Sequence, residues 1–163
     1  MERILLIGNA GAGKTTFARK LAAKCNLPLV HLDQLYWCGE WEHLTREQFD
    51  ALLQVELEKP QWIIDGNFNR TIPHRLQYCD TVFFLDLPTE VCLESIRARI
   101  GKPRSDMPWV ETEEDTEFME YIRAFSTEQR PGILSLLQKY SNVNVVTFHS
   151  REEVDAYLGK QNL

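Results

Sequence analysis

Short apolar runs alternate along this 163-residue chain with stretches whose apolar residues recur at helical spacing. The runs predict strands, and the apolar character of residues 81–85 is typical of a strand buried on both faces. Strands are expected at residues 3–7, 28–32, 61–65, 81–85 and 142–148. Helices are expected at residues 16–24, between Thr45 and Pro60, after Pro88, around 118–125, after Pro131 and after Ser150. This alternation predicts a parallel five-stranded sheet between two layers of helices, an α/β/α domain that spans residues 1–163.

Local signals indicate where some of these helices begin and which face they bury. Thr45 with Gln48, and Ser150 with Glu153, have the spacing of a capping box, in which each side chain accepts from the other's backbone amide. An apolar stripe at i, i+3, i+4 and i+7 predicts the core face of a later helix rather than a platform for stacking bases. The stripe consists of Phe118, Tyr121, Ile122 and Phe125.

The segment from Gly8 to Thr15, GNAGAGKT, matches the phosphate-binding motif G-x-x-x-x-G-K-[ST]. Its glycines let backbone amides turn toward an anion, where the dipole of the following helix adds attraction. Lys14 can reach the β- and γ-phosphates of ATP, and the Thr15 hydroxyl can ligate Mg²⁺. A glycine-rich turn without function is the alternative, but the strand before and the helix after it are the context that the motif requires. The residues expected to hold the nucleotide here are Gly8, Gly11, Ala12, Gly13, Lys14, Thr15 and Thr16.

A second part of a nucleotide site follows the third predicted strand. Asp65 ends that strand and can hold Mg²⁺ or its water shell, while Gly66 allows the backbone to approach a ligand closely. No guanine-reading N-K-x-D motif occurs, which argues against a GTPase switch, and the chain is short for most motor ATPases. The two motifs together favour a small enzyme that uses ATP and Mg²⁺.

Composition narrows the partners and the compartment. The formal net charge is −6, whereas a protein that grips nucleic acid normally carries a basic face, so direct nucleic-acid binding is disfavoured. No apolar stretch approaches the roughly 20 residues of a membrane span, and no room for a signal peptide precedes the first strand. The four cysteines are scattered without a C-x-x-C pair, which favours reduced thiols over a metal site. A cytoplasmic location is expected.

The order of these motifs resembles the small adenylate-kinase-like P-loop kinases, the group that includes adenylate, shikimate and gluconate kinases. Asp65-Gly66 matches the strand-terminal Asp-Gly of adenylate kinases, and Arg70 lies one residue later than their phosphate-gripping arginine. The segments 31–37 (HLDQLYW) and 62–68 (WIIDGNF) resemble more closely the bacterial DNA topology modulation proteins. The resemblance implies an adenylate-kinase-like fold with a short lid and ATP binding, and it names no phosphoryl acceptor.

Candidate acceptor residues follow the second predicted strand. Asp33 lies where shikimate and gluconate kinases place an acceptor-contacting carboxylate, and such a group can orient a hydroxyl and accept its proton. A turn or helix-capping role is the alternative for Asp33. His31 is interpreted as a structural hydrogen-bonding residue. Tyr36, Trp37 and Trp41 either wall an acceptor pocket or pack this segment onto the core.

The one long irregular stretch, residues 101–112, is interpreted as a short lid without metal, because loops of this length are usually functional. Arginines precede and enter it. Arg97 is assigned to the nucleotide, and Arg99 and Arg104 to the transferred phosphoryl group, because guanidinium grips phosphate with two parallel hydrogen bonds. A solvated basic face is the alternative. Arg123 and Arg130 are weaker candidates for the same site.

The sequence therefore predicts an ATP- and Mg²⁺-dependent kinase in which Lys14, Asp33, Arg99 and Arg104 act on the reaction and Thr15 and Asp65 hold the metal. Its acceptor is expected to be a small molecule whose identity the sequence does not give, and no oligomeric state follows from the residues. One alternative is a nucleotide-dependent binding or regulatory protein that affects DNA topology indirectly. Another is a nucleoside monophosphate kinase.

Overall fold

β1 (Arg3–Gly8) lies in the middle of a parallel sheet in the computed structural model, which describes residues 1–103, 109–160 and 162–163. The strand order is β2-β5-β1-β6-β7, and every neighbouring pair in it is parallel. The other strands are β2 (Leu29–His31), β5 (Trp62–Asp65), β6 (Thr81–Leu85) and β7 (Asn144–Phe148). Because the strands are parallel, their carboxyl ends lie along one edge of the sheet, where ligands gather in open α/β folds.

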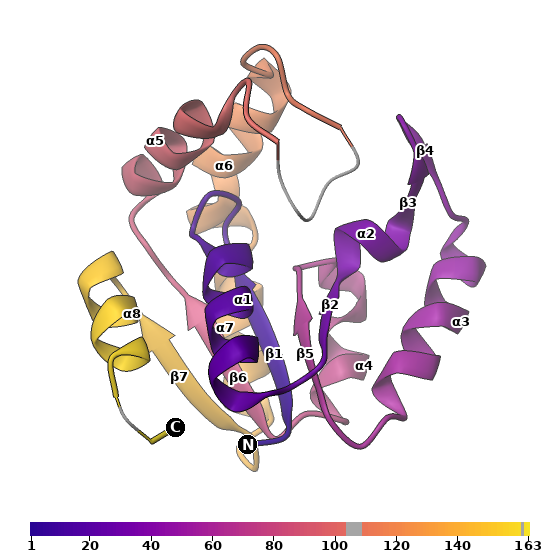
Figure 1. The fold of residues 1–163 in the computed structure, drawn as a ribbon. Coiled ribbons are helices and arrows are strands. Elements are labelled where there is room, and N and C mark those ends of the chain that lie inside the picture. Colours follow the sequence, from indigo (N-terminus) through magenta and orange to yellow (C-terminus); the bar gives the residue numbers. More distant parts are fainter. Residues whose placement is uncertain (104–108, 161) are drawn as a thin grey trace.

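Helices cover both faces of this sheet, as Figure 1 shows. The two faces follow from the alternation of side chains along each strand: Leu5 packs on one side of β1, and Ile4 and Leu6 pack on the other. The helices are α1 (Lys14–Cys25), α2 (Leu32–Tyr36), α3 (Arg46–Leu57), α4 (Ile72–Leu76), α5 (Thr89–Arg99), α6 (Thr116–Glu128), α7 (Arg130–Lys139) and α8 (Arg151–Leu158). α1, α5 and α8 pack on the Ile4 side, α3, α4 and α7 pack on the Leu5 side, and α6 contributes to both. The predicted three-layer fold with five parallel strands is confirmed.

Five short elements, among them α2 and α4, are absent from the sequence prediction. β3 (Trp37–Gly39) and β4 (Glu42–His43) form a small antiparallel hairpin apart from the main sheet. The 3-10 turn η1 (Asn69–Thr71) and α4 follow β5. These elements are short, so few periodic positions signal them in the sequence. They matter because the hairpin carries two of the four tryptophans and α4 carries a fully buried arginine.

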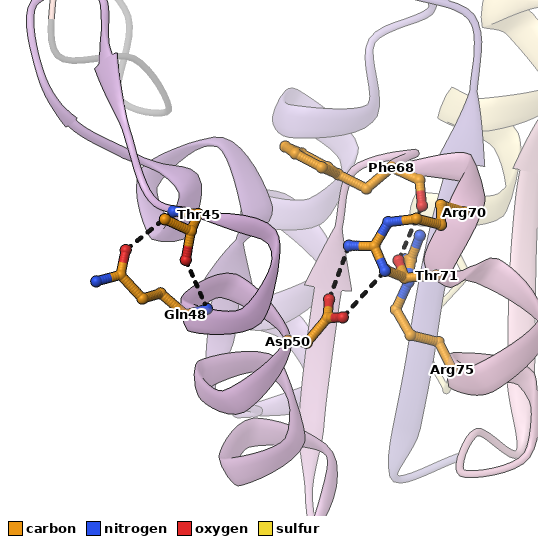
Figure 2. A network of polar contacts seen from close by, with 7 residues as sticks. All are labelled: Thr45, Gln48, Asp50, Phe68, Arg70, Thr71 and Arg75. Atoms are coloured by element: carbon orange, nitrogen blue, oxygen red, sulfur yellow. Dashed lines mark hydrogen bonds and ion pairs between the residues drawn. The ribbon is translucent and has the colours of Figure 1, made fainter.

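The two predicted capping boxes differ in outcome. At the start of α3, Gln48 N donates to Thr45 Oγ1 (3.2 Å) and Thr45 N donates to Gln48 Oε1 (2.9 Å), so this box is complete (Figure 2). At α8 only half of the box forms, because the Glu153 carboxylate accepts from His149 N (2.6 Å) instead of from Ser150 N. Ser150 has a φ of −150°, against −66° for Thr45, and this rotation changes the direction of its amide relative to the helix.

The predicted core stripe of α6 needs correction at two positions. Met119, Ile122 and Phe125 form the buried face, and Phe118 is only partly buried. Tyr121 is 38% exposed and stacks on Phe118 with ring centroids 6.4 Å apart. Ile122 and Phe125 of the predicted stripe are therefore confirmed as core residues, Met119 takes the place of Tyr121, and the Tyr121 side chain hydrogen-bonds Asn67.

Candidate functional site

The loop from Gly8 to Gly13 joins β1 to α1 at the carboxyl edge of the sheet. It lies so close to its neighbours that side chains cannot fit: a Cβ on Gly8 would meet Leu85 O at 2.5 Å, and one on Gly11 would meet Cys92 O at 2.3 Å. The loop is therefore pressed against β6 and α5, and the first turn of α1 follows at Lys14. The predicted nucleotide residues from Gly8 to Thr16 form one continuous loop and helix start, an arrangement suited to binding phosphate.

Lys14 folds back over this loop rather than pointing into solvent. Its Nζ donates to Gly8 O (3.1 Å) and to Asn9 O (2.9 Å). Burial lowers the pKa of Lys14 below its ordinary value, while the nearby carboxylates of Asp65 and Asp33 act to raise it and the charge of Arg99 acts to lower it. Lys14 therefore lies within electrostatic reach of both predicted carboxylates and of one predicted arginine.

Asp65, at the end of β5, is the most connected group of the site. Its Oδ2 accepts from the Thr15 hydroxyl (3.0 Å) and lies 2.8 Å from His31 Nδ1, and only 5% of Asp65 is exposed. His31 and Asp65 are register partners on β2 and β5, so the sheet itself sets this contact. A hydroxyl and a carboxylate are the oxygen ligands that Mg²⁺ prefers, so Thr15 and Asp65 fit the predicted metal role.

Asp33 lies in the first turn of α2, half-buried. The N-cap of that helix is His31, so Asp33 does not hold the capping position that its sequence alternative assigned to it. Instead its carboxylate acts electrostatically on Lys14. The structure thus brings Asp33 to the same side of the sheet edge as the phosphate loop.

The two arginines at the end of α5 have different surroundings. Arg99 Nε lies 3.2 Å from Glu111 Oε2, and its guanidinium lies over the Phe118 ring at 5.8 Å from the centroid. Arg97 Nε lies 3.7 Å from Glu114 Oε1 in a pair whose side chains are both nearly half exposed. Arg99 also influences Lys14, whereas no contact in the described part of the chain brings Arg97 to the loop.

The predicted lid, residues 101–112, begins directly after α5. Its described residues, 101–103 and 109–112, form neither helix nor strand, and Gly101 N donates to Glu111 O at its base. Arg104 lies outside the described residues. Trp109, near the far end, contacts the β3–β4 hairpin: its ring centroid lies 5.0 Å from that of Trp37 and 4.8 Å from that of Trp41.

The aromatic cluster after β2 divides into an inward part and an outward part. Tyr36 packs inward, with its ring stacked on His43 at 4.8 Å and edge-on to Phe49 and Phe68. Trp37 and Trp41 instead reach the lid, and Trp41 is 67% exposed. The inward member of the cluster packs this segment onto the core, and the outward members form the surface that faces the lid.

Comparison with known proteins agrees with this geometry. The model of the "ATPase family associated with various cellular activities (AAA)" matches residues 4–65, which run from β1 through the phosphate loop to Asp65. Shikimate kinase from Acinetobacter baumannii, solved in complex with shikimate, is similar in structure: TM-score 0.61, 17% identity, 97% of this chain and 91% of that chain covered. Shikimate kinase from Bacteroides thetaiotaomicron gives a TM-score of 0.56 at 21% identity, covering 96% and 94%. This chain has the α/β fold of P-loop NTPases.

Sequence reasoning missed a P-loop contact that comes from far along the chain. Arg151, at the start of α8, donates to Gly11 O (3.1 Å) and Ala12 O (3.4 Å) and also contacts Ser95. The Arg151 guanidinium thus hydrogen-bonds two carbonyls of the phosphate loop that lie about 140 positions earlier in the sequence. No local pattern marks Arg151, because its partner is backbone and not a complementary motif.

Three other arginines of the sequence analysis have partners away from the P-loop. Arg130 grips Asp86 at the end of β6 through three contacts of 2.9–3.0 Å, and this ion pair raises the pKa of Arg130. Arg70 forms a two-point ion pair with Asp50 of α3 (Figure 2), and Arg123 pairs with Glu120 on its own helix.

Among the residues that the structure describes, no cluster of three or more His, Cys, Asp or Glu side chains is suited to hold a metal ion. No helix in the described ranges has the length and apolar character needed to cross a membrane. The four cysteines are free thiols, and burial raises the pKa of Cys79 to about 12.

Proposed function

We propose that this chain is an ATP-dependent kinase that requires Mg²⁺ and transfers the γ-phosphoryl group of ATP to a hydroxyl of a small molecule. The supporting observation is that two carboxylates in different surroundings act on the loop lysine. Asp65 is buried and accepts a hydrogen bond from Thr15, so the two groups proposed to hold the metal lie side by side. Asp33 is half-buried in α2, the helix that leads into the hairpin. A protein that only bound a nucleotide would need the first carboxylate but not the second.

The residues divide the chemistry between them. The acceptor hydroxyl oxygen forms the new bond to the γ-phosphorus, the bond from that phosphorus to the leaving oxygen of ADP breaks, and the hydroxyl proton passes to the Asp33 carboxylate. Lys14 and the loop amides neutralise charge on the β- and γ-phosphates, and Arg99 and Arg104 neutralise charge on the group in transfer. Thr15 and Asp65 would hold Mg²⁺, which supplies further neutralisation of the phosphates when bound. Arg97 would contact the nucleotide.

Two observations support the acceptor class that we propose. A hydroxyl is the group that a carboxylate such as Asp33 can activate. The tryptophans of the hairpin and lid, of which Trp41 is exposed, offer flat apolar surface for an acceptor. One similar structure contains shikimate, a ligand of that enzyme. By analogy we propose a small hydroxylated acceptor for this chain, and a cytoplasmic setting where ATP is abundant.

The resemblance to the DNA topology modulation proteins supplies the alternative, a nucleotide-dependent regulator with no acceptor. A panel of nucleosides, nucleotides, sugars and hydroxy acids, assayed by ADP release from the purified chain, separates the two. A kinase gives an acceptor-dependent rate far above the background hydrolysis of ATP, and a regulator gives background with every member of the panel. A nucleoside monophosphate kinase is the third outcome, marked by competition from a bisubstrate dinucleotide such as Ap5A.

Asp33→Asn tests the assignment once an acceptor is found. The amide keeps the size of the side chain but cannot take a proton, so we expect acceptor-dependent turnover to fall about 10²- to 10⁴-fold with ATP affinity nearly unchanged. Asp50→Asn is the matched control, because Asp50 lies on α3 in an exposed ion pair with Arg70 and should leave turnover unchanged. Wild-type turnover in Asp33→Asn would rule out the catalytic role.

A further inference from the structure

The pairing of β1 with β5 ends at Leu6 and Asp65, whereas the pairing of β1 with β6 continues to Gly8 and Leu85. On β5, Gly66 N still donates to Leu6 O (3.3 Å), but then the chain turns away, with Phe68 in the left-handed region at φ 37°. The next backbone group of β5 therefore does not reach Gly8. On the other side Gly8 remains the register partner of Leu85 on β6. The first glycine of the P-loop thus lacks a backbone partner on the β5 side.

The side chain of Asn67 fills that place. Gly8 N donates to Asn67 Oδ1 (3.0 Å), and Asn67 Nδ2 donates to Gly8 O (2.6 Å). A side-chain amide carries the same donor and acceptor as a peptide group, so Asn67 continues the ladder where the strand has ended. The same Gly8 carbonyl also accepts from Lys14 Nζ, which places the loop lysine directly on the group that Asn67 holds. The Tyr121 side chain hydrogen-bonds Asn67 from α6.

Arg75 holds Asn67 in turn. Its side chain is completely buried, and its guanidinium donates to Gly66 O (3.1 Å), to Asn67 O and to Thr71 Oγ1 (3.0 Å). The Thr71 hydroxyl donates to Phe68 O (2.8 Å), as Figure 2 shows, so one arginine fixes three successive carbonyls directly or through Thr71. Burial lowers the pKa of Arg75 to about 9, which leaves the group protonated at neutral pH and its hydrogen bonds charge-assisted.

We propose that Asn67 is a positioning residue that sets the P-loop and Lys14 for nucleotide binding, and that Arg75 is the buried support of Asn67. The inference rests on the proposed function only in taking the loop to bind a nucleoside triphosphate. Neither residue is assigned contact with the nucleotide. Asn67 acts through Gly8, and Arg75 acts through the backbone of residues 66–68.

The first test compares variants at two asparagines of the same loop. Asn67→Asp keeps the volume of the side chain but places an oxygen against Gly8 O, and Asn67→Ala removes both hydrogen bonds. Asn69→Ala is the matched control, because Asn69 Nδ2 donates to Gln129 Oε1 and not to the P-loop. Readouts are ADP affinity by calorimetry, melting temperature, and hydrogen exchange of the Gly8 amide followed by ¹⁵N NMR in the nucleotide-free chain.

Asn67→Ala should bind ADP about tenfold or more weakly and exchange the Gly8 amide faster, since a buried group left without its partner is costly. Asn67→Asp keeps an acceptor for Gly8 N but loses the donor to Gly8 O, so it should weaken ADP binding with a smaller change in Gly8 exchange. Asn69→Ala should lower the melting temperature without changing either Gly8 exchange or ADP affinity. Wild-type Gly8 exchange in Asn67→Ala, or an equal loss of ADP affinity in Asn69→Ala, would overturn the proposal.

Arg75→Lys supplies a second, independent test. The lysine keeps the buried charge but cannot reach three acceptors with a planar fork. It should reproduce the change in Gly8 exchange, and combining it with Asn67→Ala should add little, because the two residues act through one contact. If the effects of Arg75→Lys and Asn67→Ala on Gly8 exchange were additive, Arg75 would not act through Asn67. The experiments distinguish this proposal from the kinase proposal. If no acceptor is found but the Asn67 variants show these effects, the positioning role of Asn67 stands and the kinase proposal fails. If the chain is an active kinase but Gly8 exchange is unchanged in the variants, the positioning role fails.

Discussion

The proposed phosphate side of the site, which comprises the loop, Asp65, Asn67 and Arg75, is built from buried or half-buried polar groups. The proposed acceptor side, which comprises Asp33 and the tryptophans of the hairpin and lid, is built from half-buried or exposed and mainly aromatic ones. On the phosphate side, Asp65 is 5% exposed and Arg75 is fully buried, and each has several hydrogen-bond partners. On the proposed acceptor side, Trp41 is 67% exposed, and its ring contacts those of Trp37 and Trp109. A buried polar network tolerates one arrangement, because a broken contact leaves a group unsatisfied, while ring contacts at a surface can change at small cost.

This difference matches two separate tasks. Binding a triphosphate requires the same geometry whatever the acceptor, so the phosphate side gains from a rigid frame of carbonyls and guanidinium groups. Choosing and releasing an acceptor requires a surface that can open and that differs between enzymes, which loops supply. The boundary between the two sides runs between Asp65 and Asp33, both of which act on Lys14.

Lys14→Ala should give the largest effect and tests the phosphate side. The loss of the ammonium should lower phosphoryl transfer about 10²-fold or more, because electrostatic stabilisation dominates this reaction. Stability should change by about 1 kcal/mol or less, since Gly8 O keeps its bond from Asn67 when Lys14 is gone. The measurements are ADP release and thermal melting. Lys20→Ala, an exposed lysine of the same helix, is the control, and normal ATP turnover in Lys14→Ala would contradict the assignment of the phosphate loop.

The same division separates what the sequence could predict from what it could not. The phosphate loop and Asp65 were predictable because a motif and a strand end place them, and the core was predictable from the alternation along the strands. The pair of hydrogen bonds between the Asn67 side chain and Gly8 was not predictable, because it depends on how β5 ends relative to a loop 59 residues earlier. The contact of Arg151 with Gly11 spans 140 residues and involves only backbone as its partner.

The acceptor side was predicted only in part, for a different physical reason. Asp33 was predicted from its place after the second strand and from the resemblance to shikimate and gluconate kinases. The contact of the tryptophans with the lid was not predicted, because it depends on a hairpin too short to show a period in the sequence. Arg97 was paired in expectation with the nucleotide, yet it meets Glu114 at an exposed surface, and Arg104 lies outside the described residues. Their assigned roles remain proposals.

Trp109→Ala should give an intermediate effect and tests whether the acceptor side is held together by its rings. Trp109 contacts both tryptophans of the hairpin, so its loss should loosen the lid end and the hairpin together. We expect hydrogen exchange at residues 37–43 and 109–114 to rise about 2- to 10-fold, the range that an aromatic pair supports. ATP affinity should stay the same.

Trp109→Phe is the control for this change because it keeps a ring in place, and its exchange should stay close to that of the wild type. Adding a non-hydrolysable ATP analogue should slow exchange at residues 109–114 in the wild type more than in Trp109→Ala. Unchanged hydrogen exchange at residues 37–43 in Trp109→Ala would show that Trp109 does not hold the hairpin. A loss of ATP affinity in this variant would show that the acceptor side and the phosphate side are coupled.

Asp50→Asn should give the smallest effect, and it tests whether the exposed Asp50–Arg70 ion pair belongs to the phosphate side. Hydrogen bonds from Arg70 lower the pKa of Asp50, so the unfolded chain binds more protons than the folded one in the acidic range. The ion pair therefore contributes stability above the unfolded carboxyl pKa, about 3.9, and loses that contribution as the pH falls through the lower folded value. Because both side chains are more than 40% exposed, we expect the variant to lose less than about 1 kcal/mol at pH 7.

Denaturant unfolding of the two proteins at pH 7 and at pH 3 measures this contribution, and the gap between them should narrow at the lower pH. It should also narrow in 1 M salt, where screening acts over about 3 Å. A pH-independent gap would remove the ion pair as its cause. A loss of several kcal/mol would mean that the contact between α3 and η1 belongs with the rigid phosphate side, since η1 follows directly on the Asn67 loop that Arg75 supports. A small, salt-sensitive loss in the free energy of unfolding would instead show that Arg75 belongs to the buried polar network of the phosphate side and that Arg70 does not.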